Sequence, residues 1–207
     1  MLDPIGRFRL VIDCATAACS VALTDGDRLI DERHELVGRG HAERLVPMIQ
    51  ELLGDRRPAS ILVDCGPGSF TGVRVGLAAA HGLAIGWRAP LHGYSSLAVI
   101  AAAAQASGEL AVALQAGHGQ LFVQSYAPNP LTPLDELRSL LPADAAAAIR
   151  AYRVVGLGAE TLVTARGYGE AQDALPRAAD SRFLPEPLRT LQPRPIYGRA
   201  PDAKPQA

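Results

Sequence analysis

Residues 60–72 read SILVDCGPGSFTG, a short apolar run followed by a glycine-rich turn. The run has the length and the composition of a buried strand. The apolar stretch after the turn, which continues to about Gly86, predicts a helix. Glycines allow a tight backbone approach, and the free N–H groups at a helix N-terminus attract anions. This strand–turn–helix unit therefore predicts an α/β fold.

The glycine-rich turn does not match two common catalytic motifs. It is not a Walker A loop, because Val73 and Arg74 follow Gly72 where that motif needs lysine and a hydroxyl residue. Ser69 also lacks the G-x-S-x-G frame of a nucleophile elbow. Two interpretations remain open. The turn binds an anion, or Ser69 or Thr71 caps the helix while the glycines adopt positive φ.

Three strands are predicted upstream of this unit, at residues 8–13, 19–24 and 28–32. Asp25-Gly26 is a hairpin turn between the last two, so the three form an antiparallel meander. Apolar residues then recur at helical spacing from Ala42 to Leu53. Pro47 lies inside this pattern, which predicts a helix that starts near Val46 or is kinked at the proline.

The second half repeats this rhythm more weakly. Strands are predicted at residues 110–115 and 121–126, helices at 133–141 and 143–150, and a final strand at 153–156. Prolines such as Pro193, Pro195, Pro201 and Pro205 predict irregular structure from about Asp180 onward. We expect a duplicated two-lobe chain with a first lobe at 1–107, a smaller lobe at 108–179 and a Pro-rich segment at 180–207.

Composition limits the classes of function. The 20 basic and 21 acidic residues give a net charge of −1 without a basic block, so any nucleic-acid contact should need a partner. Three cysteines without a C-x-x-C pair indicate a reduced, cytosolic chain. The N-terminus lacks an export signal, and the apolar segment 78–85 is too short to cross a bilayer, so no membrane role is expected.

Asp13 and Thr16 are the first candidates for chemistry. A carboxylate at a strand end and a nearby hydroxyl could orient a hydrated metal and a phosphate, although a lone strand-end aspartate is more often a turn acceptor. The scattered histidines have no H-x-x-x-H or H-E-x-x-H spacing, so a metallohydrolase site is not supported. These are His41, His81, His92 and His118.

A stripe of small residues follows the glycine-rich turn at intervals of four: Gly72, Gly76, Ala80 and Ala84. Such a stripe exposes nearly bare backbone on one side of a helix, which permits close contact with a neighbouring element. The neighbour can be internal, as core packing, or a second chain, as an interface. The sequence leaves both alternatives open.

Several segments match the motifs of a known protein family in order and spacing. The longest are IDCATAACSVAL at 12–23, HAERLVPMI at 41–49 and GPGSFTGVRVG at 66–76, of which the third is highly specific. Shorter similarities are GYSSL at 93–97, VGLG at 155–158 and PIYGR at 195–199. Together these segments resemble the TsaB (YeaZ) family, closely over most of residues 8–105 and loosely over the remainder.

This resemblance implies a two-lobe actin/Hsp70-like fold (ASKHA, ribonuclease H-like) with mixed sheets flanked by helices and an abbreviated second lobe. It also implies a role in making N6-threonylcarbamoyladenosine beside the tRNA anticodon. Family members act as scaffolds or activators that pair with the catalytic paralogue TsaD, and the ATPase TsaE joins them. ATP and metal are then expected on the partners, tRNA is reached only through the complex, and the isolated chain can form homodimers in the cytoplasm.

The resemblance also implies a set of partner-binding residues, and we expect no catalytic residue and no metal site in this chain. The pairing helices of the family match residues 41–53 and 71–86, which implies partner binding by His41, Leu45, Ile49, Leu52, Gly72, Val73, Gly76, Ala79, Ala80 and Leu83. Apart from the resemblance, the strand-end carboxylate and the glycine-rich turn indicate a weaker nucleotide site at Asp13, Thr16, Gly66, Gly68 and Ser69.

The chain departs from the family pattern at residues 113–116, which read ALQA where a Leu/Ile-Asp-Ala stretch is usual. Gln115 is neutral, whereas the second-lobe acid of an actin-like site helps to hold a hydrated metal. This argues against hydrolysis by the chain. The alternatives are a nucleotide-dependent enzyme that uses Asp13 and Thr16, and a glycoprotease-like peptidase, for which neither a metal-ligand pair nor an activated nucleophile is apparent.

Overall fold

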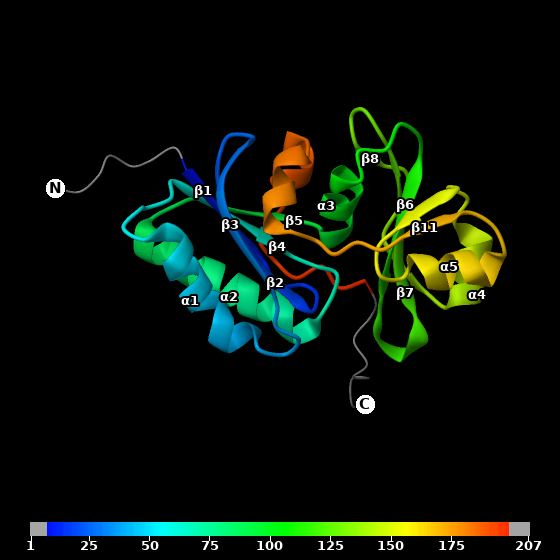
Figure 1. Ribbon diagram of the computed structural model, residues 1–207, viewed down its shortest axis with the longest axis horizontal. Helices are drawn as coiled ribbons and strands as arrows, with labels where there is room; N and C mark the ends of the chain where they lie inside the picture. Colours follow the sequence, from blue (N-terminus) through cyan, green and yellow to red (C-terminus); the bar gives the residue numbers. More distant parts are fainter. Residues whose placement is uncertain (1–7, 199–207) are drawn as a thin grey trace, which may run out of the picture.

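The computed structural model describes residues 8–198 and shows two lobes side by side (Figure 1). The sheet of the first lobe has the strand order β3-β2-β1-β4-β5. Its strands are β1 (Phe8–Asp13), β2 (Ala18–Asp25), β3 (Arg28–Leu36), β4 (Ser60–Asp64) and β5 (Leu91–Tyr94). Strands β1 to β3 form the expected antiparallel meander, and β4 and β5 extend the sheet in parallel on the other side of β1.

The sheet of the second lobe repeats this arrangement. Its order is β11-β10-β6-β7-β8, with β9 also paired to β7. The strands are β6 (Leu110–Gln115), β7 (Leu121–Ala127), β8 (Thr132–Pro133), β9 (Arg138–Leu140), β10 (Arg153–Val155) and β11 (Glu170–Gln172). As β1 does, β6 has an antiparallel neighbour on one side and a parallel neighbour on the other. The two mixed sheets confirm the expected fold class, and several strands of the second sheet are short.

Helices cover both outer faces and fill the space between the sheets (Figure 1). The described helical segments are α1 (His41–Leu53), α2 (Phe70–Trp87), α3 (Ser96–Ala103), α4 (Pro142–Ala148), α5 (Ala159–Arg166), and the 3₁₀ turns η1 (Gly117–Gly119), η2 (Ala178–Phe183) and η3 (Glu186–Arg189). Alternation along β1 sends Leu10 and Ile12 toward α1 and α2, and Val11 toward the core between the sheets. No helix within residues 8–198 is long and apolar enough to cross a membrane.

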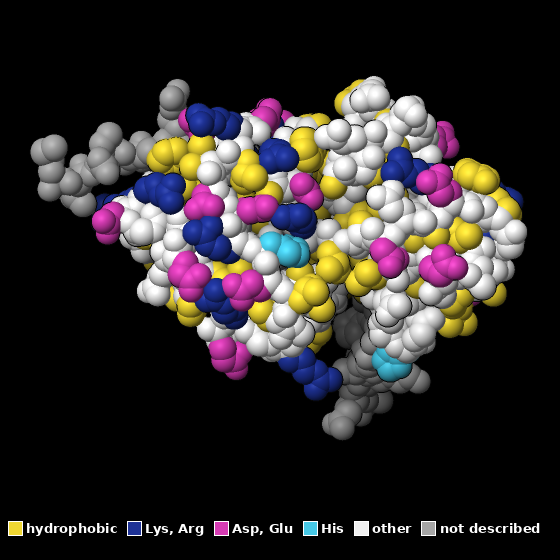
Figure 2. Space-filling model, in the orientation of Figure 1, with side chains coloured by type: hydrophobic (Ala, Val, Ile, Leu, Met, Phe, Trp, Pro, Cys, Tyr) yellow, Lys and Arg dark blue, Asp and Glu magenta, His cyan; other side chains and the backbone are white. Residues whose placement is uncertain are grey.

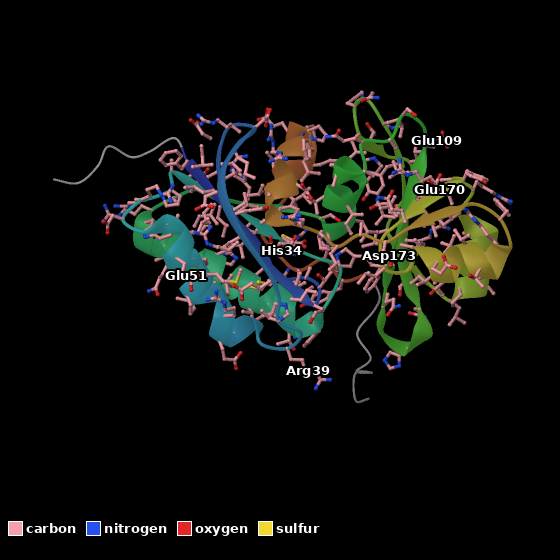
Figure 3. The ribbon with its side chains drawn as sticks, in the orientation of Figure 1. His34, Arg39, Glu51, Glu109, Glu170 and Asp173 are labelled. Atoms are coloured by element: carbon pink, nitrogen blue, oxygen red, sulfur yellow. The ribbon has the colours of Figure 1, made fainter. Side chains whose placement is uncertain are left out.

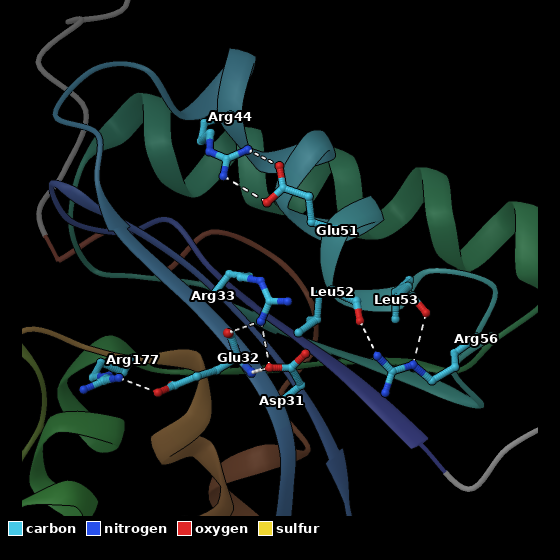
Figure 4. Close-up of polar contacts among 9 residues, drawn as sticks. All are labelled: Asp31, Glu32, Arg33, Arg44, Glu51, Leu52, Leu53, Arg56 and Arg177. Atoms are coloured by element: carbon cyan, nitrogen blue, oxygen red, sulfur yellow. Dashed lines mark hydrogen bonds and ion pairs between the residues drawn. The ribbon is translucent and has the colours of Figure 1, made fainter.

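The chain returns to the first lobe after β11. Arg177 forms an ion pair with Glu32 of β3 at 2.6 Å (Figure 4), and the backbone N–H of Ala178 donates to Ser20 Oγ at 3.0 Å. The segment from Asp180 onward, which the sequence predicts to be irregular, contains the rest of η2 and all of η3. Residues 1–7 and 199–207, with Arg199, Pro201 and Pro205, lie outside the described range, so the predictions for them stay predictions.

The prediction of a helix at 133–141 is wrong. This segment contains the end of β8 and all of β9, which pairs antiparallel with β7. The carboxylate of Asp135 accepts hydrogen bonds from the backbone N–H of Ser125 at 2.8 Å and from its hydroxyl at 3.0 Å. These tertiary bonds tie the segment to the sheet and override its weak helical pattern.

Other boundaries also differ from expectation. Helix α1 begins at His41 rather than near Val46 and contains Pro47, while β3 runs four residues past its predicted end to Leu36. The strand at 153–156 is not the last, because β11 follows it. Sequence patterns also missed β5, α3 and α5. Helix α3 shows no periodicity because it is apolar and buried on nearly all sides.

Candidate functional site

A cleft of about 940 Å³ lies between the lobes. The first lobe lines it with the turn after β1, the loop before α1 and the start of α2; the second lobe adds the end of β6 and Phe122. Arg39 and Arg74 are the charged lining residues within residues 8–198, so the cleft is cationic although the whole chain has a net charge of −1. Figure 3 shows Arg39 projecting away from the ribbon at the edge of the molecule.

The predicted nucleotide-binding residues divide into two groups. Thr16, Gly68 and Ser69 line the cleft, whereas Asp13 and Gly66 do not. Ser69 caps α2, because its hydroxyl accepts the N–H of Gly72 at 3.2 Å. A Cβ on Gly68 would lie 2.0 Å from the carbonyl oxygen of Ala15, so this glycine permits the close approach of two loops. The turn thus has a packing role whether or not it also binds an anion.

Asp13 points into the core, where it is 1% exposed. Tyr94 donates its hydroxyl to Asp13 Oδ2 at 2.8 Å, and the backbone N–H of Ala15 donates to Oδ1 at 3.3 Å. Asp64, at the end of the neighbouring strand, accepts the hydroxyl of Ser96 and the N–H of Gly66. Burial raises the pKa of both carboxyls, and the charge of Asp13 raises the pKa of Asp64 further.

Sequence reasoning missed Asp64 and Tyr94 as neighbours of Asp13, and Ser96 as the partner of Asp64. A signal for Asp64 was present: it ends a predicted strand, as Asp13 does. Strands β1 and β4 are parallel neighbours, so their carboxyl ends meet at one edge of the sheet. The resulting arrangement is a buried polar cluster in which Asp13 acts as a turn acceptor.

Asp64→Asn should flatten the pH dependence of stability. The ordinary pKa of Asp64 is 3.8 and its folded value is raised well above this. The unfolded chain therefore ionises first, so the free energy of unfolding falls as pH rises above 3.8 until the folded carboxyl also ionises. Asparagine keeps an acceptor for Ser96 and Gly66 but cannot titrate. Urea unfolding across this pH range should show a smaller fall in the free energy of unfolding for the variant than for the wild type. An equal fall in both proteins would refute the raised pKa of Asp64.

On the opposite wall, Gln115 ends β6 and is exposed. Its amide donates to the carbonyl oxygen of Leu157 at 3.4 Å. No aspartate or glutamate within residues 8–198 is among the residues that line the cleft. The lining therefore offers hydroxyl, amide, guanidinium and apolar groups.

The mouth of the cleft carries an ordered arginine. The guanidinium of Arg74 lies 3.3 Å from the ring centre of Phe70, and its Nη2 donates to the hydroxyl of Tyr197 at 2.9 Å. Phe70 and Tyr197 are both exposed. This contact links α2 to the segment that returns from the second lobe.

The predicted partner-binding residues are mostly buried in the chain's own core. Of the ten, only Ala79 and Leu83 remain partly exposed. Those buried are His41, Leu45, Ile49, Leu52, Gly72, Val73, Gly76 and Ala80. His41 anchors α1, because its Nε2 lies 2.8 Å from the carbonyl oxygen of Thr16.

Gly72, Gly76 and Ala80 of the small-residue stripe therefore face the chain's own core, which is the internal alternative that the sequence left open. A Cβ on Gly72 would lie 2.0 Å from the carbonyl oxygen of Cys14, and one on Gly76 would lie 3.5 Å from Cys14 Cβ. The bare side of α2 thus packs on the end of β1 and the turn after it. A bulky residue at Gly76 or Ala80 should therefore disturb this packing.

A different stripe of α2 faces solvent: Ala78, Gly82, Ile85 and Gly86. A Cβ on Gly82 or Gly86 would meet no neighbouring atom within 4 Å, so the packing of this chain does not require either glycine. Ile85 is 80% exposed, and Val46 on the adjacent helix α1 is 51% exposed. The outer face of α1 and α2 thus combines exposed apolar side chains with accessible backbone.

Figure 2 shows charged side chains of both signs scattered over the visible side of the molecule, without a block of one sign. Arg44 of α1 binds Glu35 of β3 at 2.5 Å and Glu51 of its own helix at 2.8 Å; Figure 4 shows the second pair. These pairs are exposed, so each adds little to stability. They hold the guanidinium between β3 and its own helix.

Comparisons with known proteins agree with this fold. A family model described as TsaD, tRNA N6-adenosine threonylcarbamoyltransferase, matches residues 34–153. TsaB of Escherichia coli K12, a tRNA threonylcarbamoyladenosine biosynthesis protein, is 37% identical over 125 residues, which are 56% of this chain and 54% of that protein. An uncharacterized protein of Mycobacterium tuberculosis H37Rv is 33% identical over 215 aligned positions, 96% of this chain and 94% of its own length.

The solved structure of YeaZ from Pseudomonas aeruginosa superposes with a TM-score of 0.78 at 28% identity. The superposition covers 92% of this chain and 99% of that one, so both lobes take part. The relatives named TsaB and the structure named YeaZ support the resemblance that the sequence motifs indicate. The chain belongs to the TsaB (YeaZ) family.

Proposed function

We propose that this chain is a non-catalytic partner subunit in the synthesis of tRNA N6-threonylcarbamoyladenosine, and that it pairs with a TsaD-like paralogue. The observation that carries the proposal is the solvent-facing stripe of α2. A helix-interior glycine costs about 1 kcal/mol relative to alanine. Gly82 and Gly86 have no internal contact that explains this cost. Close approach by a helix of another chain would account for them.

The cleft supports the non-catalytic part of the proposal. A carboxylate that holds hydrated metal must reach the ligand, whereas the oxygens of Asp13 are engaged by Tyr94 and Ala15 inside the core. The second-lobe wall presents the neutral amide of Gln115. We therefore assign ATP and metal to the partner subunits, including a TsaE-like ATPase.

The remaining parts of the proposal concern the assembly. The exposed apolar residues of α1 and α2 fit a TsaD-like helix pair, and in isolation a second copy of this chain can occupy the same face. We assign tRNA contact to the complex, because charges of both signs are mixed on the surface in Figure 2. The proposed compartment is the cytoplasm.

Titration of the purified chain with ATP and Mg²⁺ separates this proposal from a nucleotide-dependent enzyme. We expect no phosphate release above a buffer control, and no change in phosphate release for Asp13→Asn. Calorimetric binding of ATP with a micromolar dissociation constant, together with sustained phosphate release by the chain alone, would favour the enzyme. The cleft lining justifies this second candidate, because Thr16, Ser69 and two arginines could contact a phosphate. The peptidase alternative receives no comparable support from the described contacts.

A further inference from the structure

Two cysteines face each other across the turn that follows β1. Cys14 Sγ and Cys19 Sγ lie 3.7 Å apart, and the residues are 2% and 0% exposed. The pairing of β1 with β2 ends at Asp13 and Ser20, so Cys14 and Cys19 occupy the next opposed positions. Neither sulfur has another hydrogen-bond partner among the described contacts. The sulfurs are held together by the fold itself.

The third cysteine lies in a different environment. Cys65 Sγ is 3.6 Å from the carbonyl oxygen of Val63 and 3.8 Å from that of Gln192, and both contacts are to backbone. Burial raises the pKa of this thiol to about 12. Cys65 is therefore an internal comparison: equally buried, but without a thiol neighbour.

We propose that Cys14 and Cys19 form an oxidative modification site that closes into an intrachain disulfide when the chain meets a peroxide. The bond length of a disulfide is about 2.0 Å, so the two sulfurs must approach by about 1.7 Å. Residues 14–17 lie outside the β1–β2 ladder and include the exposed Ala17, so rotation of the cysteine side chains and a small shift of this turn can supply the movement.

The chemistry needs only the peroxide. One thiolate attacks an oxygen of hydrogen peroxide, which forms a sulfenic acid and releases hydroxide. The sulfur of the second cysteine then attacks the sulfenic sulfur, and the oxygen bound to that sulfur leaves as water. Overall, two thiols are oxidised and one peroxide is reduced to two waters. The hydrogen bond between the two sulfurs lowers the pKa of Cys19 and raises the pKa of Cys14, so we expect Cys19 to be the first nucleophile.

Closing this bridge changes the packing beneath α2. The carbonyl oxygen of Cys14 lies against Gly72, and its Cβ lies against Gly76. The next residue, Ala15, approaches Gly68 and lines the cleft. Movement of Cys14 toward Cys19 therefore alters both the seat of α2 and one wall of the cleft. The modification site does not depend on the proposed partner role.

Peroxide treatment of the native full-length chain tests this proposal. Residues 10–28 form one tryptic peptide that contains both cysteines, so a disulfide lowers its mass by two hydrogens and blocks alkylation after denaturation. We expect this product to form about tenfold faster than any oxidation of Cys65, and a thiol reductant to reverse it. Cys14→Ser and Cys19→Ser should each prevent the disulfide. In each variant the remaining cysteine should be found either as a thiol that can be alkylated or as its own oxidised form.

Three results would overturn the proposal. The first is full alkylation of Cys14 and Cys19 after an exposure that oxidises them in the urea-unfolded chain. The second is conversion to sulfinic acid without the bridged product. The third is oxidation of Cys65 at the same rate as the pair, which would show that oxidation follows general unfolding and not the proximity of the two sulfurs.

Discussion

Gly72→Ala should destabilise the folded chain by about 3 kcal/mol, near the upper end for overpacking a core. The added Cβ would lie 2.0 Å from the carbonyl oxygen of Cys14 and 3.2 Å from its carbonyl carbon. Both are backbone atoms, so no side chain can rotate away, and either α2 or the turn after β1 must shift. Urea denaturation of the purified variant measures the loss as a lower midpoint at an unchanged slope.

Gly82→Ala is the matched control for Gly72→Ala. It lies ten residues later on the same helix, and its added Cβ meets no neighbouring atom within 4 Å. Alanine has the higher helix propensity, so this variant should be more stable than the wild type by up to about 1 kcal/mol. Equal effects of the two substitutions would show that the Gly72 stripe is not the internal face of α2.

Gly82→Arg should weaken association with a TsaD-like partner by about 100-fold, which corresponds to about 2.7 kcal/mol. The side chain would extend from the solvent-facing stripe, where it fills the space that a close helix contact requires. It should leave the monomer folded, because no atom of this chain occupies that space. Calorimetric titration gives the dissociation constant, and thermal unfolding of the variant alone checks the fold.

Gly108→Arg provides the control for charge and size. Gly108 is also exposed and without a neighbouring atom within 4 Å of an added Cβ, but it lies in the loop between α3 and β6. This variant should bind the partner as the wild type does. A similar loss of affinity in both variants, or no loss of affinity in Gly82→Arg, would show that the solvent-facing stripe is not part of the interface.

The first lobe could be predicted well from the sequence because its strands carry local signals. The strands at β1, β2 and β4 are compact apolar runs, and Asp25-Gly26 marks the hairpin. The second lobe was harder. Strand β9 is held by the contacts of Asp135 with Ser125, and β11 is three residues long at a sheet edge, so neither produces a pattern in its own sequence.

The candidate site shows the same limit. Spacing predicts that Gly72, Gly76 and Ala80 share one side of a helix, but it does not say whether that side faces the core or solvent. The face is decided by Cys14, which lies far away in the sequence and contacts this side directly. Likewise, the role of Asp13 depends on Tyr94, 81 residues later, whose hydroxyl turns the carboxylate inward.

Sedimentation of the wild-type chain with the TsaD-like protein of the same organism tests the central claim most directly. At about 10 μM of each, a dissociation constant near 1 μM would place most of both chains in one complex. We predict a single faster species that contains both chains, and threonylcarbamoylation of tRNA only in preparations that contain the TsaD-like subunit. Two separate species under every nucleotide condition, or tRNA modification by this chain alone, would contradict the account.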